Sequence, residues 1–160
     1  MSIKSVYQGV IVSAAAALAT ALVLAPVPMR GQLNEKDKAF KAKQIAKAFE
    51  NNATRMTFRD RTGKQVGEAF GERALYGAAV LSPDRTHVAF VKNDLDNETA
   101  DLYVLEIAGG KETRLTTSKK TEFVQAPIWS PDGKQLGYVQ IRDGKEGVYR
   151  TWAPADAGAD

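Results

Sequence analysis

The stretch IWSPDGKQLGYV, residues 128–139, decides the fold, because an earlier stretch of the chain matches it position by position. That earlier stretch is VLSPDRTHVAFV, residues 80–91, which lies 48 residues upstream. In both copies Ser-Pro-Asp is typical of a tight turn, since proline presets its backbone angle and the aspartate accepts hydrogen bonds from backbone amides. Large apolar side chains then alternate with smaller or polar ones, as in a β-strand. The repeat therefore predicts two similar hairpins.

The two copies differ at the last turn position, where the second has Gly133 and the first has Arg85. Glycine adopts the left-handed backbone angle freely, whereas for another residue this angle costs about 1 kcal/mol or more of conformational free energy. We therefore expect the first turn to be reshaped. In each strand after the turn we expect one large apolar face, carried by Val88 and Phe90 in the first copy and by Leu136 and Tyr138 in the second.

Further strand and turn patterns surround the two copies from Thr54 onward. A strand follows each copy, at residues 101–107 and 147–152, and the first of these turns at Gly109-Gly110 into residues 112–116. Upstream, residues 55–60 and 64–70 flank Arg61-Thr62-Gly63 and predict another hairpin. The part of the chain after Thr54 is therefore expected to be β throughout.

This pattern resembles the PD-type WD-like β-propeller repeat family, found in TolB-like periplasmic proteins and in the propellers of prolyl oligopeptidase family enzymes. The resemblance covers about residues 56–152 and is carried by residues 126–134, Asp101-Leu102-Tyr103, Gly109-Gly110 and Arg114-Leu115-Thr116. The chain departs from the family at Arg85, which replaces the turn glycine, and after Ala153, where no counterpart of Arg114-Leu115-Thr116 follows. The resemblance implies four-stranded antiparallel blades, the second of which lacks its outer strand.

We therefore expect a mainly β fold in which residues 55–160 form an incomplete β-propeller of about two and a half blades. Propellers have at least about four blades, so this stretch is too short to close a ring by itself. Its first and last blades would leave apolar faces and strand edges open. Such surfaces predict self-association or binding to another protein.

Residues 1–30 have the order of a signal peptide or membrane anchor. Lys4 precedes an uncharged, alanine-rich run from Val10 to Ala25, and Ala19-Thr20-Ala21 fits a cleavage site. If the run is not cut, Val10 to Ala25 are expected to form an N-terminal hydrophobic helix, and residues 10–29 are long enough to act as a membrane tether. Most positive charge follows the run, however, and positive charge prefers the cytoplasmic side. Export or outward anchoring is favoured, and an inverted anchor or a buried helix is the alternative.

Residues 34–50 predict an amphipathic spacer helix capped by Asn34. Its apolar stripe recurs at three-and-four spacing and consists of Ala42, Ile45, Ala46 and Phe49. Its other face carries Lys36, Lys38, Lys41, Lys43 and Lys47. A solvated face is the favoured interpretation because acidic residues are interspersed, and contact with anionic lipid headgroups is the alternative.

Composition excludes several kinds of site. The chain has no cysteine and a single histidine, which excludes disulfides, thiolate metal sites and histidine-pair metal sites. Its net charge of +3 comes from 22 basic and 19 acidic residues that are interleaved, so nucleic acid is not an expected partner. No Gly-x-Ser-x-Gly elbow, phosphate loop or dinucleotide fingerprint occurs. We therefore assign no catalytic, cofactor-binding or metal-binding residue.

Three individual features have both a functional and a purely structural interpretation. His87 aligns with Gln135 and is expected at an exposed or blade-edge position rather than as an acid or base. The acidic loop, residues 93–101, is expected to be a solvated connection, with oxygen ligation of calcium as the alternative. Trp129 is expected in the core because it lies in an apolar strand beside the turn.

Together these features favour an exported or membrane-tethered, TolB-like scaffold that binds a protein or another component of the cell envelope, and not an enzyme. The alternative is the propeller portion of a prolyl oligopeptidase family peptidase whose catalytic domain is absent from these residues. Both interpretations are analogies from a fold.

Overall fold

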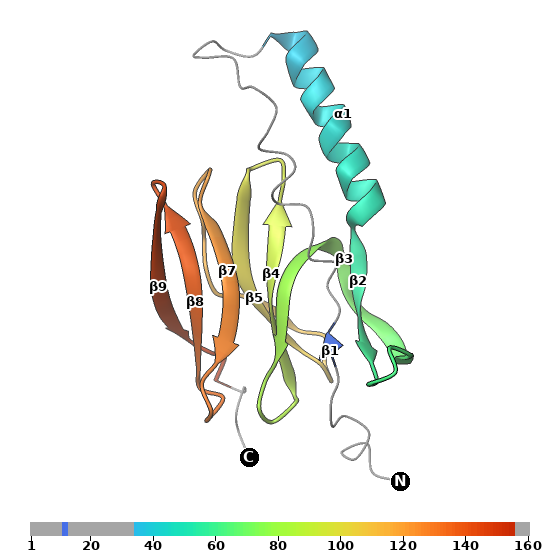
Figure 1. The fold of residues 1–160 in the computed structure, drawn as a ribbon, viewed down its shortest axis with the longest axis vertical. Coiled ribbons are helices and arrows are strands. Elements are labelled where there is room, and N and C mark those ends of the chain that lie inside the picture. Colours follow the sequence, from blue (N-terminus) through green and yellow to red (C-terminus); the bar gives the residue numbers. More distant parts are fainter. Residues whose placement is uncertain (1–10, 13–33, 156–160) are drawn as a thin grey trace.

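The computed structural model describes residues 11–12 and 34–155, which form one helix and nine strands (Figure 1). The helix and the first strands are α1 (Glu35–Asn52), β1 (Ile11–Val12), β2 (Thr54–Arg59), β3 (Gln65–Leu81) and β4 (His87–Asp94). The remaining strands are β5 (Thr99–Glu106), β6 (Glu112–Arg114), β7 (Phe123–Trp129), β8 (Gln135–Arg142) and β9 (Lys145–Trp152). The expected mainly β fold is confirmed, as an open sheet.

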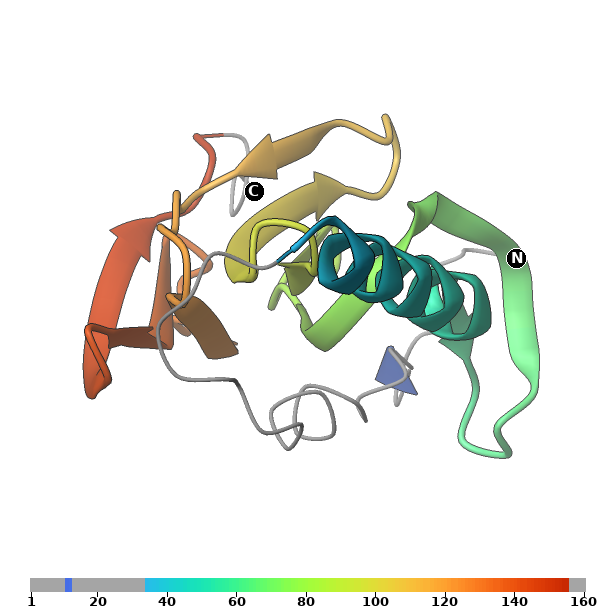
Figure 2. The same cartoon turned by 90° about the horizontal axis from the view of Figure 1, so that it is seen from above.

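Strand pairing divides this sheet into three antiparallel sets, which lie side by side in chain order (Figure 2). The first set contains β1, β2 and the first part of β3. The middle set contains the second part of β3, from Leu75 onward, with β4, β5 and β6. The last set contains β7, β8 and β9. The middle and last sets are joined by one parallel pair, Ala100 with Phe123.

The strand β3 belongs to two sets because its backbone bends at Gly71, where φ is 71°. A Cβ atom at this position would lie 3.1 Å from the Tyr76 hydroxyl and 3.2 Å from the terminal methyl of Met56. Both the angle and the space therefore require glycine. The hairpin expected upstream is present, and its turn contains Gly63 with φ of 85°.

The two Ser-Pro-Asp turns have the same geometry. The Arg85 amide donates to the Ser82 carbonyl at 3.0 Å, and the Gly133 amide donates to the Ser130 carbonyl at 3.0 Å. Each serine hydroxyl also donates to the aspartate two residues later, at 2.5 and 2.6 Å. The φ angles of Arg85 and Gly133 are 66° and 69°. The expectation of a reshaped first turn was wrong, because these hydrogen bonds hold Arg85 in the left-handed conformation.

Two hydrophobic clusters fill the spaces between the three sets. The cluster between the first and middle sets consists of Met56, Phe58, Ala74, Tyr76, Val88, Phe90 and Leu105. The cluster between the middle and last sets consists of Ala89, Val91, Ala100, Leu102, Val104, Val124, Leu136 and Tyr138. Alternate side chains of β4 and β5 therefore enter different clusters, as the two-residue period of a strand requires.

Trp129 packs against the second of these clusters, so its expected core position is confirmed. Its side chain is half-buried, and its indole nitrogen donates to the Val80 carbonyl at 3.2 Å. This hydrogen bond satisfies the polar end of a ring whose remaining surface is apolar.

Helix α1 begins where the sequence predicts, because the Asn34 side chain accepts a hydrogen bond from the Asp37 amide at 2.9 Å. It continues to Asn52, and none of its residues is buried. Of the expected apolar stripe, only Ile45 is half-buried, whereas Ala42, Ala46 and Phe49 are exposed. The helix therefore does not pack its predicted apolar face on the sheet.

The orientation of α1 is set instead by polar contacts with one strand connection and with strand β3. Lys41 forms an ion pair with Glu98, in the loop between β4 and β5. The Arg73 guanidinium donates to the carbonyls of Glu50 and Ala53, at 2.7 and 3.1 Å. These bonds satisfy carbonyl groups at the end of the helix, which have no partners within it.

The apolar run near the amino end lies largely outside the described residues. Ile11 and Val12, which belong to that run, form β1 and pair with Arg59 and Phe58 of β2. These two residues are thus in a strand, and the helix expected over residues 10–25 is otherwise not described. No helix within residues 34–155 is both long and apolar enough to cross a membrane.

Candidate protein-binding surface

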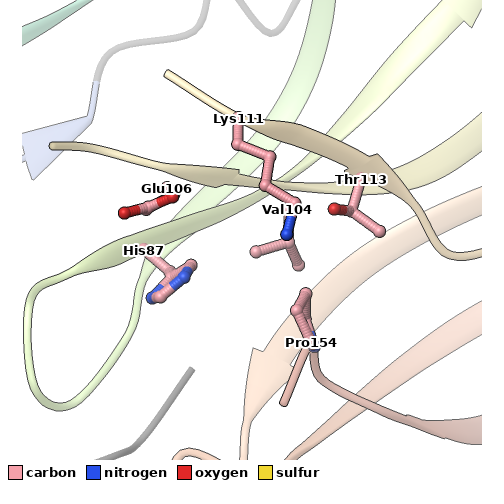
Figure 3. A pocket seen from close by; sticks show the side chains of 6 residues that line it. All are labelled: His87, Val104, Glu106, Lys111, Thr113 and Pro154. Carbon is pink, nitrogen blue, oxygen red and sulfur yellow. The ribbon is translucent and has the colours of Figure 1, made fainter. Parts of the chain in front are cut away.

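A narrow hollow lies beside His87, between the middle set and the end of the last set (Figure 3). It is lined by His87, Val104, Glu106, Lys111, Thr113 and Pro154, and has no volume for a water-sized molecule. His87 is 3% exposed and its Nδ1 lies 2.7 Å from the Thr86 hydroxyl. The expectation of an exposed position was wrong, because residues distant in sequence cover this ring, which lies at the first position of β4. A substrate has no room here.

A wider polar hollow of about 440 Å³ lies next to the acidic loop. It is lined by Asp94, Asp96, Asn97, Thr99, Arg114, Ser118 and Lys120. Asp94 accepts hydrogen bonds from the backbone amide and the side chain of Asn97, and these bonds lower the pKa of its carboxyl group. Within residues 34–155, no group of three or more aspartate, glutamate or histidine residues is arranged to hold a metal ion.

The expectation of a solvated loop over residues 93–101 was wrong at both of its ends, because Asn93 lies in β4 and Thr99–Asp101 are buried in β5. The Asp101 side chain joins β5 to the segment after β6. Its carboxylate accepts hydrogen bonds from the Arg114 guanidinium at 2.5 Å and from the Thr116 hydroxyl and the Ser118 amide, both at 2.8 Å. The bond with Asp101 also raises the pKa of Arg114. These bonds fix β6 and the segment after it along the outer edge of the middle set.

Lys92 ties the first set to the outer strand of the middle set. Its ammonium group lies 2.5 Å from carboxylate oxygens of both Glu72 and Glu112, and 4.6 Å from the Tyr103 ring centroid. Burial opposes the charge of Lys92, but the hydrogen bonds to Glu112 and Glu72 outweigh it, so the pKa of Lys92 is raised. The first and middle sets are thus joined by charge as well as by apolar packing.

The outer face of the last set has no such cover among the described residues. We call this surface the outer face, and it is formed by Ile128, Val139, Val148 and Trp152. Val148 is 85% exposed, Trp152 69% and Ile128 66%. Apolar side chains exposed together in this way are typical of an interaction site rather than of a solvated surface.

The strand at the margin of this face also has a free edge. Among the described residues, β9 pairs with β8 and with no strand on its other side. Its remaining backbone N–H and C=O groups are therefore available to pair with another strand. An apolar face and a free edge occur together on β9, which is the arrangement that binding by strand addition requires.

At the opposite end of the sheet, the side of β2 that faces away from the core is polar. Along β2, Met56 and Phe58 point into the core, and Arg55 and Arg59 project on the other side. The two arginine side chains are exposed and donate to the carbonyls of Gly71 and Gly63. A polar outer side of this kind is suited to solvent, as terminal repeats in a stack require.

The sequence predicted open faces at both ends of the repeats, but not that they would differ. Val148, Arg150 and Trp152 are two residues apart, so they form one row on the same side of β9, in which the apolar Val148 and Trp152 flank the charged Arg150. Nothing in the sequence indicated whether that row or the opposite one would be covered. The structure answers this, because the covered side is the one that contacts the middle set.

Comparison with known proteins gives a partial likeness in fold. No family model matches the sequence. A structure of a protein assigned as TolB from Agrobacterium tumefaciens is 22% identical with a TM-score of 0.49, over 64% of this chain and 35% of that one. A TolB from Acinetobacter baumannii is 21% identical with a TM-score of 0.46, over 66% of this chain and 28% of that one. The chain thus spans about a third of the length of these two structures.

Proposed function

We propose that this chain is a TolB-like β-propeller-repeat protein that acts as a protein-binding scaffold in the cell envelope. In this proposal the middle set is one four-stranded blade, the first set is the end of a preceding blade, and the last set is the first three strands of a following blade. The antiparallel order of β3, β4, β5 and β6 supports this assignment, because it is the order expected of one blade.

The single observation that carries the proposal is the exposure of Val148. In the middle set the equivalent residue is Leu102, since Leu102 pairs with Val91 and Val148 pairs with Val139 of the repeat. Leu102 is completely buried by the neighbouring set, whereas Val148 is 85% exposed. The outer face therefore has the chemistry of a surface that another blade or a partner protein covers.

The proposed partner binds by covering this face and pairing with the edge of β9. Burying Val148, Trp152 and Ile128 removes apolar area from water, which stabilises the complex by about 25 cal/mol per Å². Backbone pairing along β9 then fixes the register of the partner. The signal-like order of residues 1–30 supports a location in the envelope.

Site-specific photo-crosslinking in cells that express the full chain tests this surface. A photoreactive residue at Val148 is expected to give a crosslinked product of defined mass, and one at Arg55, on the polar side of the first set, is not. The product from Val148 should disappear when Ile128→Asp and Trp152→Asp are added. Equal products at both positions, or none at Val148, would overturn the proposed surface. Full-length chain in the soluble cytoplasm would overturn the proposed location.

A further inference from the structure

Helix α1 carries a basic stripe on the side turned away from the sheet. The row with reduced exposure is Lys41, Ile45, Ala48 and Asn52, at spacings of four and three residues. A second row with the same spacing lies on a different side of the helix and consists of Lys36, Phe40, Lys43 and Lys47. At about 100° per residue, the two rows are separated by roughly 140° around the helix axis.

All four residues of this basic stripe are exposed, and Phe40 is 65% exposed. The three lysines have no ion pair among residues 34–155, in contrast to Lys38, which pairs with Glu35 at 2.9 Å. The acid next to the stripe on the helix is Glu50. A phenylalanine is thus held in the middle of a row of unpaired lysines.

We infer that this stripe binds the surface of an anionic lipid bilayer. The lysines would lie against anionic headgroups, and Phe40 would enter the boundary between headgroups and acyl chains. The alternative of a merely solvated helix explains exposed lysines, but it does not explain an exposed aromatic ring among them. Charge complementarity identifies the occupant as anionic, and the ring identifies it as a lipid surface rather than a soluble acid.

The position of α1 in the chain fits this partner. The apolar run that ends at Ala25 is separated from Glu35 by nine residues, which span at most about 30 Å when extended. If that run is retained as a tether, the helix stays within reach of the same membrane. The stripe lies on α1 and the outer face lies on the last set, so the two proposals can fail independently.

Vesicle sedimentation with the full chain provides the test. The chain is expected to bind vesicles that contain phosphatidylglycerol more tightly than vesicles of phosphatidylcholine alone. The apolar run is uncharged and binds both kinds of vesicle equally, so the ratio of the two affinities does not contain its contribution. Each lysine contributes about a fivefold preference, so the triple variant K36Q/K43Q/K47Q should reduce the preference by about a hundredfold.

The matched control is K64Q/K119Q/K134Q, which removes the same charge from exposed positions of the β region. It should leave the preference within about twofold of the wild-type chain. Equal losses in the two triple variants, or no preference for anionic vesicles in the wild-type chain, would overturn the inference.

A second measurement reports on Phe40 itself. The chain has no cysteine, so Phe40→Cys can carry a single environment-sensitive fluorophore. Its emission should rise on addition of anionic vesicles, whereas the same probe at Thr62, in the turn between β2 and β3, should not respond. A response at Thr62 equal to that at position 40, or none at position 40, would contradict insertion of this side of α1.

Discussion

Leu102 and Val148 occupy the same place in two copies of one repeat and have opposite surroundings. Both are apolar, and both lie opposite a valine of the preceding strand. Leu102 is completely buried and Val148 is 85% exposed. The difference arises from what lies beside each set: the last set covers the middle one, and no described segment covers the last. The repeat sequence places apolar residues on both sides of the strand, and the neighbouring set of strands determines which side is buried.

The outer edges of the two copies also differ, because among the described residues the edge of the middle set is hydrogen-bonded and that of the last set is not. Asp101 accepts hydrogen bonds from Arg114, Thr116 and Ser118, and so fixes the segment that follows β6. The equivalent residue in the last set is Gly147, which pairs with Gln140 as Asp101 pairs with Lys92. A glycine has no side chain for such bonds. The middle set therefore has a closed edge, and the last set has an open one.

The largest expected effect comes from truncating the two equivalent residues. Leu102→Ala should reduce the free energy of unfolding by about 2–5 kcal/mol, because it leaves a cavity in the cluster between the sets. Val148→Ala should change it by less than about 0.5 kcal/mol, because this side chain is at the surface. Urea denaturation at two protein concentrations measures both. A large loss at Val148 that grows with concentration would show that a second copy covers the outer face in solution.

A pH effect should come from the other covered interface, between the first and middle sets. Burial raises the pKa of Tyr76 to about 12 from an ordinary value of 10.0. The folded protein therefore favours the neutral phenol, and this contribution is complete below pH 10 and is lost as the pH rises from about 10 to 12. At about 1.4 kcal/mol per unit, the loss is at most roughly 3 kcal/mol.

Urea denaturation of the wild-type chain and of Tyr76→Phe across this pH range checks the effect. The variant loses the hydroxyl that donates to the Glu72 carbonyl at 2.7 Å, so it should be less stable at pH 7. Its stability should nevertheless fall less steeply above pH 10. If both proteins fall equally steeply, Tyr76 is not the group that titrates.

The smallest expected effect compares the two turns. Arg85→Gly should raise the free energy of unfolding by about 0.5–1 kcal/mol, because glycine adopts the φ of 66° without strain. Gly133→Ala should lower it by about 1 kcal/mol for the opposite reason. Thermal melts measure both, as shifts of roughly 2–4 °C. Arg85→Ala is the control, because it removes the side chain but keeps the strain, and a gain equal to that of Arg85→Gly would contradict the backbone explanation.

Much of the β region could be predicted because its signals are local. Proline, aspartate and glycine determine the turns at residues 82–85 and 130–133 through bonds within a few residues, and two-residue alternation determines the strands between them. The cap at Asn34 is local for the same reason. Arg85 shows the limit of such reasoning: its intrinsic preference indicated a different turn, and the hydrogen bonds of the turn outweighed it.

Only the tertiary structure decided which side of each element meets another. His87 is buried by Pro154 and neighbours that are distant in sequence. Helix α1 turns Lys41 toward the sheet together with only Ile45 of its apolar stripe, because Glu98 and Arg73 are placed to hold it. The sequence by itself determined turns, strands and the apolar rows on them, since these follow from bonds between near neighbours. Burial depends on segments far apart in the chain, so only their packing distinguished Leu102 from Val148.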